Sequence, residues 1–133
     1  MVAIRRGEPR DLPRLMEFDR LLGDRVNEIV ERRMLVAEVD ATVVGYLAWQ
    51  HGGCIGKDYV NKLVVDDNYR RRGVAQALTQ ALGTALSGRI YISTGGANTA
   101  ALSLINGTGW TAAGRIDGLL PLDEPELFFR RDL

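Results

Sequence analysis

The feature that most constrains the fold of this chain is a β-type run that leads, through a short polar turn, into an amphipathic helical segment. Tyr59–Val65 is the β-type run, and apolar residues recur at helical spacing from Gly73 to Leu86. A further β-type run, Arg89–Thr94, follows the helical segment. Because a strand–helix–strand unit packs back onto its own sheet with one hand, this order predicts a right-handed parallel crossover.

Shorter segments on either side predict the rest of the sheet and its helices. Further strands are predicted at Val2–Arg6, Met34–Val39, Thr42–Trp49, Trp110–Arg115 and Glu126–Arg131, with a tight hairpin at Asp40–Ala41. Further helices are predicted after a cap at Asp11, from about Asp24 to Arg33, and over Asn98–Asn106. We therefore expect an α/β (α+β) fold, with a mixed, mostly antiparallel central sheet of about six to seven strands and helices on both faces. A chain of 133 residues is expected to form a single domain over residues 1–133.

Charge and composition narrow the classes of partner. Acidic and basic residues balance at 17 each, which argues against a nucleic-acid or anionic membrane partner. No stretch approaches the roughly 18 consecutive apolar residues that a membrane span needs. The single cysteine, Cys54, and the lack of a secretory signal favour a cytoplasmic location, and no metal site is expected.

The turn and helix start at Arg70–Ala75 have the properties of an anion cradle. Amides at a helix start have no partner inside the helix, and the dipole there is positive. Gly73 and Ala75 present almost no side chain, and Arg70, Arg71 and Arg72 add positive charge. The segment matches neither the Walker pattern nor the dinucleotide fingerprint. It therefore predicts a pyrophosphate site, with an exposed basic turn as the alternative interpretation.

Two motifs resemble those of the GCN5-related N-acetyltransferase (GNAT) family. They are Arg70-x-x-Gly73-x-Ala75 directly after a β-run, and Asn98-x-x-Ala101-x-x-Leu104 followed by Gly109-Trp110. The first is similar to the acetyl-CoA signature of the family and the second to its later Asn-containing motif. The order of elements across nearly the whole chain is similar as well.

The resemblance implies transfer of an acetyl group from acetyl-CoA to a primary amine of a small molecule or protein. Backbone groups at the matching positions Leu63, Val64 and Val65 would pair with the pantetheine arm, and an amide near Val64 or Val65 would polarise the thioester carbonyl. The pyrophosphate would be held by the segment Arg70, Arg71, Arg72, Gly73, Val74 and Ala75. Asn98 would bond the pantetheine, cap its own helix, or do both.

Two departures from the family pattern bear on catalysis. Asn61 stands where the family commonly has a general-base Glu, and Ile105 stands where it has a general-acid Tyr. The catalytic residues therefore stay unknown at this point, with Ser103 near the thiol as one candidate. The alternative function is a catalytically weak or inactive coenzyme A-binding regulatory module, which these two departures favour.

The acceptor is not determined by the sequence. Several acids in the segments that face the acceptor in relatives either attract a cationic amine or form a solvated loop face; they are Asp24, Glu28, Asp117, Asp123 and Glu124. Tyr59 is expected in the core with its hydroxyl at an edge. The apolar closing run Leu127-Phe128-Phe129 is compatible with a homodimer, and the resemblance implies one because homodimers are common in the family.

Overall fold

The chain folds into seven strands and four α-helices, and the computed structural model describes the backbone of residues 1–133 and every side chain except that of Leu122. The strands are β1 (Ala3–Arg6), β2 (Met34–Val39), β3 (Thr42–Cys54), β4 (Lys57–Val65), β5 (Arg89–Gly95), β6 (Thr111–Ile116) and β7 (Glu126–Asp132). The helices are α1 (Leu12–Phe18), α2 (Val26–Val30), α3 (Val74–Ala81) and α4 (Thr99–Ile105). Short 3-10 turns lie at η1 (Pro9–Asp11), η2 (Asp67–Tyr69), η3 (Leu82–Thr84) and η4 (Pro121–Asp123).

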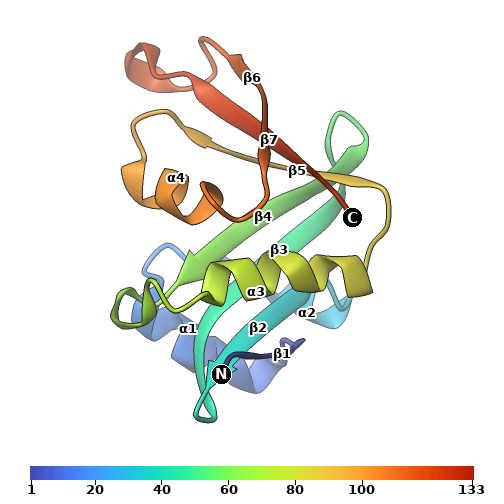
Figure 1. Cartoon of the computed structure of the whole chain (residues 1–133), viewed down its shortest axis with the longest axis vertical. Helices are drawn as coiled ribbons and strands as arrows, with labels where there is room; N and C mark the ends of the chain where they lie inside the picture. The colour runs from blue at the N-terminus through green and yellow to red at the C-terminus, as the bar shows by residue number, and fades with distance from the viewer.

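All seven strands belong to one sheet, in the order β1-β2-β3-β4-β5-β7-β6 (Figure 1). Neighbouring strands are antiparallel except for β4 and β5, which are parallel and are connected through α3. The predicted crossover and the mixed, mostly antiparallel sheet are therefore confirmed. The hairpin turn between β2 and β3 is confirmed too, since Asp40 and Ala41 have φ values of 50° and 63°. A type I′ turn needs positive φ at both of its central residues.

Helices cover both faces of the sheet, as predicted. Helix α3 buries Leu78 on one face, in a core that continues through Leu82 and Ile90. On the other face, Leu15 of α1 and Ile29 of α2 pack in a second core. Strand β3 lies between the two layers, so every residue from 43 to 49 is buried, whichever face its side chain points to. The fully covered centre of the sheet is the rigid base on which the site is built.

Three details of the predicted helices were wrong. Helix α2 covers only Val26–Val30 rather than Asp24–Arg33, because Arg32 adopts a left-handed conformation with φ 61° and ends the helical path. Helix α3 stops at Ala81 and continues as the 3-10 turn Leu82–Thr84. Asp11 occupies the start of α1, but its carboxylate accepts bonds from the Arg5 guanidinium and from a backbone amide outside that helix.

None of the helices in the described part of the chain has the length and apolarity needed to span a bilayer.

The close approach of α3 to the sheet depends on the absence of a side chain at Gly45 of β3. A Cβ atom at this position would lie 2.9 Å from Val74 Cγ1 and 3.0 Å from the carbonyl oxygen of Val64. Val64 cannot move away, because its contact is made by the backbone of the neighbouring strand. Gly45 therefore sets the height at which the first turn of α3 sits above the sheet.

We expect Gly45→Ala to lower the free energy of unfolding by about 1–3 kcal/mol, because it overpacks the contact between β3 and α3. Urea unfolding of the two proteins measures the difference. Gly83→Ala is the matched control, since a Cβ there meets no described atom within 4 Å and the change is expected to be neutral or slightly stabilising. Equal stability of the Gly45→Ala protein and the wild type would contradict this account of the packing.

Candidate functional site

The site begins where strand β4 separates from strand β5. Within the described chain, the two strands pair in parallel at two positions, Asp58 with Ile90 and Tyr59 with Tyr91. Figure 1 shows the strands spreading apart from there toward the side on which α4 lies. The separation leaves the facing edges of both strands without a neighbouring strand, so their backbone groups need other partners.

A β-bulge in β4 accompanies the separation. Across the hairpin, Trp49 pairs with Val60, whereas the preceding residue, Ala48, pairs with Lys62. Asn61 is therefore the extra residue of β4. A bulge bends a strand and re-aims the side chains next to it, which is why bulges recur beside functional sites.

Successive residues of β4 direct their N–H and C=O groups to alternate sides, and this alternation determines which of them face the gap. The amide of Asp66 donates to the carbonyl oxygen of Val44 on β3 at 2.8 Å. Residues two apart on an antiparallel strand direct their N–H and C=O groups to the same side, so those of Val64 also face β3. The N–H and C=O groups of Leu63 and Val65 consequently face the open gap.

Two cavities lie along this opening. The first, here called the gap cavity, has a volume of about 230 Å³ and is lined by Val60, Asn61, Lys62, Leu63, Val64, Ile92, Ser93, Thr94, Asn98, Ala101, Leu104 and Ile105. The second, here called the turn cavity, has a volume of about 310 Å³ and is lined by Val65, Tyr69, Arg70, Arg71, Gly73, Val74, Ala75, Gln76, Ser103, Leu104 and Thr108. Leu104 lines both, so the two cavities are neighbours along α4.

The predicted coenzyme residues divide between the two cavities. Leu63, Val64 and Asn98 line the gap cavity, and Val65, Arg70, Arg71, Gly73, Val74 and Ala75 line the turn cavity. Arg72 is outside both linings as the described residues form them. Segments that are about 30 residues apart in the sequence thus meet at one opening, as a strand–helix–strand crossover requires.

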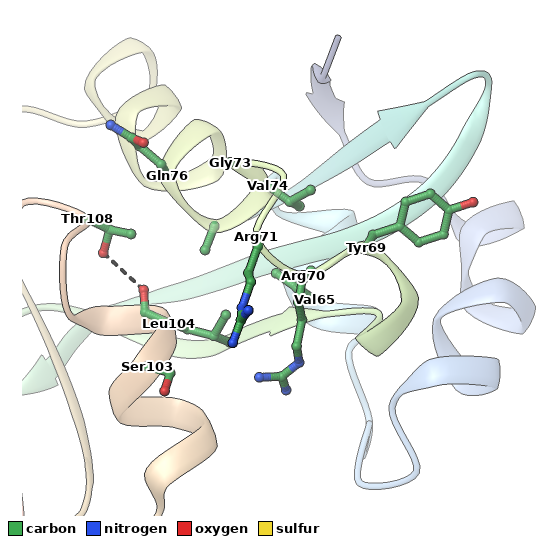
Figure 2. A pocket seen from close by; sticks show the side chains of 11 residues that line it. Val65, Tyr69, Arg70, Arg71, Gly73, Val74, Gln76, Ser103, Leu104 and Thr108 are labelled. Carbon is green, nitrogen blue, oxygen red and sulfur yellow. Dashed lines mark hydrogen bonds between the residues drawn. The ribbon is translucent and has the colours of Figure 1, made fainter.

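The three consecutive arginines have three different environments. Arg70 donates from Nε to the Asp67 carboxylate at 2.8 Å. The guanidinium of Arg72 lies over the Tyr69 ring, 5.1 Å from its centroid. Arg71 extends into the turn cavity toward α4, while Tyr69 points away from it (Figure 2). Arg71 and the partly neutralised Arg70 therefore supply the positive charge in this cavity.

Two left-handed residues shape the turn before α3. Arg71 has a φ of 63° and Gly73, the N-cap of α3, has a φ of 76°. Within the described residues no side chain caps this helix, so the amides of its first turn are left without a side-chain acceptor. These amides and the positive end of the helix dipole favour an anion at this point.

Asn98 and Ile105 mark the two ends of α4. The Asn98 side chain caps the helix, accepting from the Ala101 amide at 3.1 Å through Oδ1, so the predicted cap is confirmed. Its Nδ2 group is not used in that bond, and Asn98 is one of the residues that line the gap cavity. Ile105 is buried in the core on the α3 side and supplies no proton.

Glu28 proved to be neither a solvated loop acid nor free to attract a cation. It is buried with 5% exposure and accepts from Arg25 Nη1 at 3.1 Å and from Asn61 Nδ2 at 2.9 Å. The bond from Asn61 joins α2 to the bulge of β4, on the face opposite α3. Because Nδ2 of Asn61 is engaged by Glu28, its Oδ1 is the atom left for a partner in the gap cavity.

A second cluster of polar side chains lies near the gap, and no local sequence pattern predicts it. Tyr59, Ser93 and Glu126 form a hydrogen-bonded chain, with Tyr59 Oη 2.6 Å from Ser93 Oγ and Ser93 Oγ 2.7 Å from Glu126 Oε2. Burial raises the pKa of the Tyr59 hydroxyl, and the charge of Glu126 adds to this effect. The three residues come from β4, β5 and β7, so they meet only because of the order of the strands in the sheet. Ser103, the candidate from the sequence, lines the turn cavity instead.

Comparison with known proteins places this geometry in a family. A family model described as an acetyltransferase (GNAT) domain matches residues 31–109, which include β4, α3, β5 and α4. No match was found among curated proteins.

Several solved structures have the same fold. An acetyltransferase of the GNAT family from Bacillus cereus is similar at a TM-score of 0.79 and 22% identity, over 99% of this chain and 97% of its own. An acetyltransferase from Bacillus anthracis, solved in complex with acetyl coenzyme A, has a TM-score of 0.79 at 17% identity, over 100% and 99% of the two chains. The ribosomal-protein-S18-alanine N-acetyltransferase from Escherichia coli has a TM-score of 0.74 at 17% identity, over 99% and 94%.

Proposed function

Because this chain belongs to the acetyltransferase (GNAT) family, we propose that it moves an acetyl group from acetyl-CoA to a primary amine of a small molecule or protein. Acetyl-CoA is the acetyl donor of this enzyme. The observation that carries the proposal is the opening between β4 and β5, whose cavity shares Leu104 with a second cavity at an uncapped helix start with two arginines. The alternative of a binding module without activity is not favoured by the family match.

The pyrophosphate of the coenzyme is assigned to the turn cavity. The first amides of α3 donate to the phosphate oxygens, and Arg71, from the turn just before the helix, adds a charge-assisted contact. Gly73 and Ala75 leave room for the anion to reach the backbone. Arg70 contributes less charge because Asp67 holds part of it, and Arg72 acts through the field of the turn rather than by contact.

The pantetheine arm and thioester are assigned to the gap cavity. Leu63 and Val65 offer N–H and C=O groups that face the gap, so they extend the sheet by pairing with the amide groups of the arm. Val64 also lines the cavity, but its backbone groups face β3 and are therefore not available to the arm. The donor that polarises the thioester carbonyl is drawn from the amides of Leu63 and Val65. The Nδ2 group of Asn98 provides a further donor to the arm.

The acceptor is assigned to the face of the gap away from α3. Asn61 presents Oδ1 to this side, where it can accept a hydrogen bond from an incoming amine. The Arg25–Glu28 ion pair behind it adds little net charge, because the two charges cancel. Its Glu28 carboxylate holds Asn61 in place. A primary amine that approaches here meets the thioester carbon at the point where the strands have parted.

Gly73→Glu is expected to abolish coenzyme A binding. The new side chain enters the turn cavity and sets a carboxylate against the phosphates, while a Cβ at this position meets no described protein atom within 4 Å. The measurement is titration calorimetry with coenzyme A.

Gly88→Glu is the matched control for this change. Gly88 has a φ of 85°, close to the 76° of Gly73, and its Cβ position is equally open, but it lies in the turn before β5. Both variants carry the strain of a left-handed non-glycine residue, about 1–2 kcal/mol. Retained affinity in Gly73→Glu would overturn the assignment of the pyrophosphate site, and equal loss in both variants would assign the effect to strain.

Asn98 offers a test that separates its cap from its contact with the coenzyme. We expect Asn98→Ala to lower the free energy of unfolding by about 0.5–2 kcal/mol, because the Ala101 amide loses its acceptor. Asn98→Asp keeps an acceptor for that amide and should retain the stability. Both variants lack the Nδ2 donor, so both should bind coenzyme A more weakly, as calorimetry would measure. Full affinity in Asn98→Asp would limit the role of Asn98 to the cap.

The proposed function is tested by binding and turnover of the wild type. Acetyl-CoA and coenzyme A are expected to raise the thermal midpoint, and ATP to raise it little, since a ligand stabilises the state that binds it. Release of the coenzyme A thiol is then followed with polyamines, amino acids, aminoglycosides, hydroxylamine and peptides with free N-termini as acceptors. Stabilisation by coenzyme A with no thiol release above background for any of these amines would contradict amine acetylation.

A further inference from the structure

The hydrogen-bonded chain Tyr59–Ser93–Glu126 has a defined direction. A carboxylate only accepts, so Ser93 gives its single hydroxyl proton to Glu126 Oε2, at 2.7 Å. The remaining contact, 2.6 Å between Tyr59 Oη and Ser93 Oγ, must then have Tyr59 as its donor. Ser93 is therefore held between a donor and an anionic acceptor, with one lone pair of its oxygen left over.

The chain lies on the acceptor side of the gap. Ile92 and Val60 belong to the core on the α3 side, so Ser93 and Tyr59, their neighbours along the strands, point to the opposite face. Tyr59 stands at the last parallel pair between β4 and β5, immediately before the strands part. Ser93 lines the gap cavity together with Asn61 and Leu63. Ser93 thus lines the cavity to which the thioester is assigned, and its side chain points to the acceptor side.

Glu126 differs from the other carboxylates near the gap in its hydrogen-bond partner. Glu28 is paired with Arg25 and Glu124 accepts from the Ala97 amide, whereas Glu126 accepts from the Ser93 hydroxyl. Among the described side chains, no arginine, lysine or histidine nitrogen lies within 4.0 Å of Glu126. A carboxylate that accepts a hydrogen bond from a hydroxyl is placed to act as the final proton acceptor through that hydroxyl.

We propose that Glu126 receives the proton of the attacking amine through Ser93, and that Tyr59 is a positioning residue that orients the Ser93 hydroxyl. The inference rests on the proposed function, because it supplies the proton acceptor that Asn61 does not provide. Ser93 is the group that touches the acceptor amine, and Glu126 acts through it.

The proposed step transfers one acetyl group and moves one proton from the amine to Glu126. The nitrogen lone pair of a neutral amine forms a C–N bond with the thioester carbon, and the nitrogen acquires a positive charge. An N–H proton passes to Ser93 Oγ as the original Ser93 proton passes to Glu126 Oε2. The C–S bond breaks and its electron pair leaves with the coenzyme A sulfur. The thiolate takes up one proton from solvent, Glu126 later returns its proton to solvent, and the products are the N-acetylamine and the free thiol.

Glu126→Gln tests the proposal because Gln still accepts a hydrogen bond from Ser93 but is not a base. Two acceptors are compared with saturating acetyl-CoA. After attack, the nitrogen of 1,3-diaminopropane, a strongly basic primary amine, holds its extra proton tightly, whereas that of hydroxylamine, a weak base, releases the proton readily to water. We expect kcat with diaminopropane to fall about 10²-fold, within the usual range for loss of a proton acceptor, and kcat with hydroxylamine to fall less than about tenfold. The KM for each amine should change little, whereas loss of simple charge attraction would raise KM.

Variants of Ser93 and a control complete the test. Ser93→Ala should reproduce the loss of kcat with diaminopropane, and Ser93→Thr, which restores the hydroxyl, should recover most of it. Asp132→Asn removes a carboxylate from the other end of β7, where it pairs with Arg89, and should leave kcat unchanged. Calorimetry with coenzyme A should give wild-type affinity for each of these proteins, which shows that the fold and the coenzyme site are intact.

The outcomes separate this inference from the proposed function. Unchanged kcat in Glu126→Gln, or equal loss with both amines, would overturn the proton route and leave acetyl transfer standing. Failure of Ser93→Thr to recover activity, at wild-type coenzyme affinity, would also count against the route. A wild-type protein that releases no thiol with either amine would contradict acetyl transfer itself, and the proton route would fall with it.

Discussion

The short pairing between β4 and β5 is the constraint on which the rest of the structure depends. Two residue pairs hold these strands together, and beyond Tyr59 and Tyr91 they part. Strand edges inside a protein must find other hydrogen-bond partners, because buried N–H and C=O groups without partners are costly. Part of the opening is filled by α4, which places Leu104 against both cavities and buries Ile105 beneath them. The remainder is available to an extended ligand that carries amide groups of its own.

The fully covered centre of the sheet keeps this opening in shape. Strand β3 is buried on both faces, and α3 approaches it closely at Gly45, so the start of α3 is fixed relative to the end of β4. On the opposite face, Arg14 of α1 donates to the Asp66 carboxylate at 2.6 Å, at the residue where β4 ends and the turn begins. Asp66 is buried, so this ion pair is shielded from solvent and ties the turn to the second layer of helices. The turn that presents Arg71 and Gly73 is therefore anchored from both sides.

The two faces of the opening serve different substrates in the proposed reaction. The side with α3 and α4 supplies main-chain donors and arginines, which suit a diphosphate and a pantetheine arm. The opposite side supplies Asn61, Ser93 and Glu126, which suit an amine and its proton. Such a division lets the amine reach the thioester carbon without displacing the coenzyme. In the proposed route Glu126 takes the place of the Glu that Asn61 replaces, and the thiolate leaves without a proton donor at position 105.

The sequence by itself determined the elements with strong local patterns. The apolar run of β4, the amphipathic face of α3, the Asp40–Ala41 hairpin and the Asn98 cap all follow from interactions within a few residues, and the structure confirms them. The Arg70–Ala75 turn could be predicted in the same way, because a helix start and its flanking charges are adjacent in the sequence. The bounds of α2 were wrong, since its end depends on the left-handed conformation of Arg32. Only the tertiary structure decided that Glu28 is buried against Asn61, and that Ser93 joins Tyr59 to Glu126. Those contacts join residues 33 or 34 positions apart, and they depend on strand order, a β-bulge and the point at which β4 and β5 separate, none of which leaves a periodic signal in the sequence.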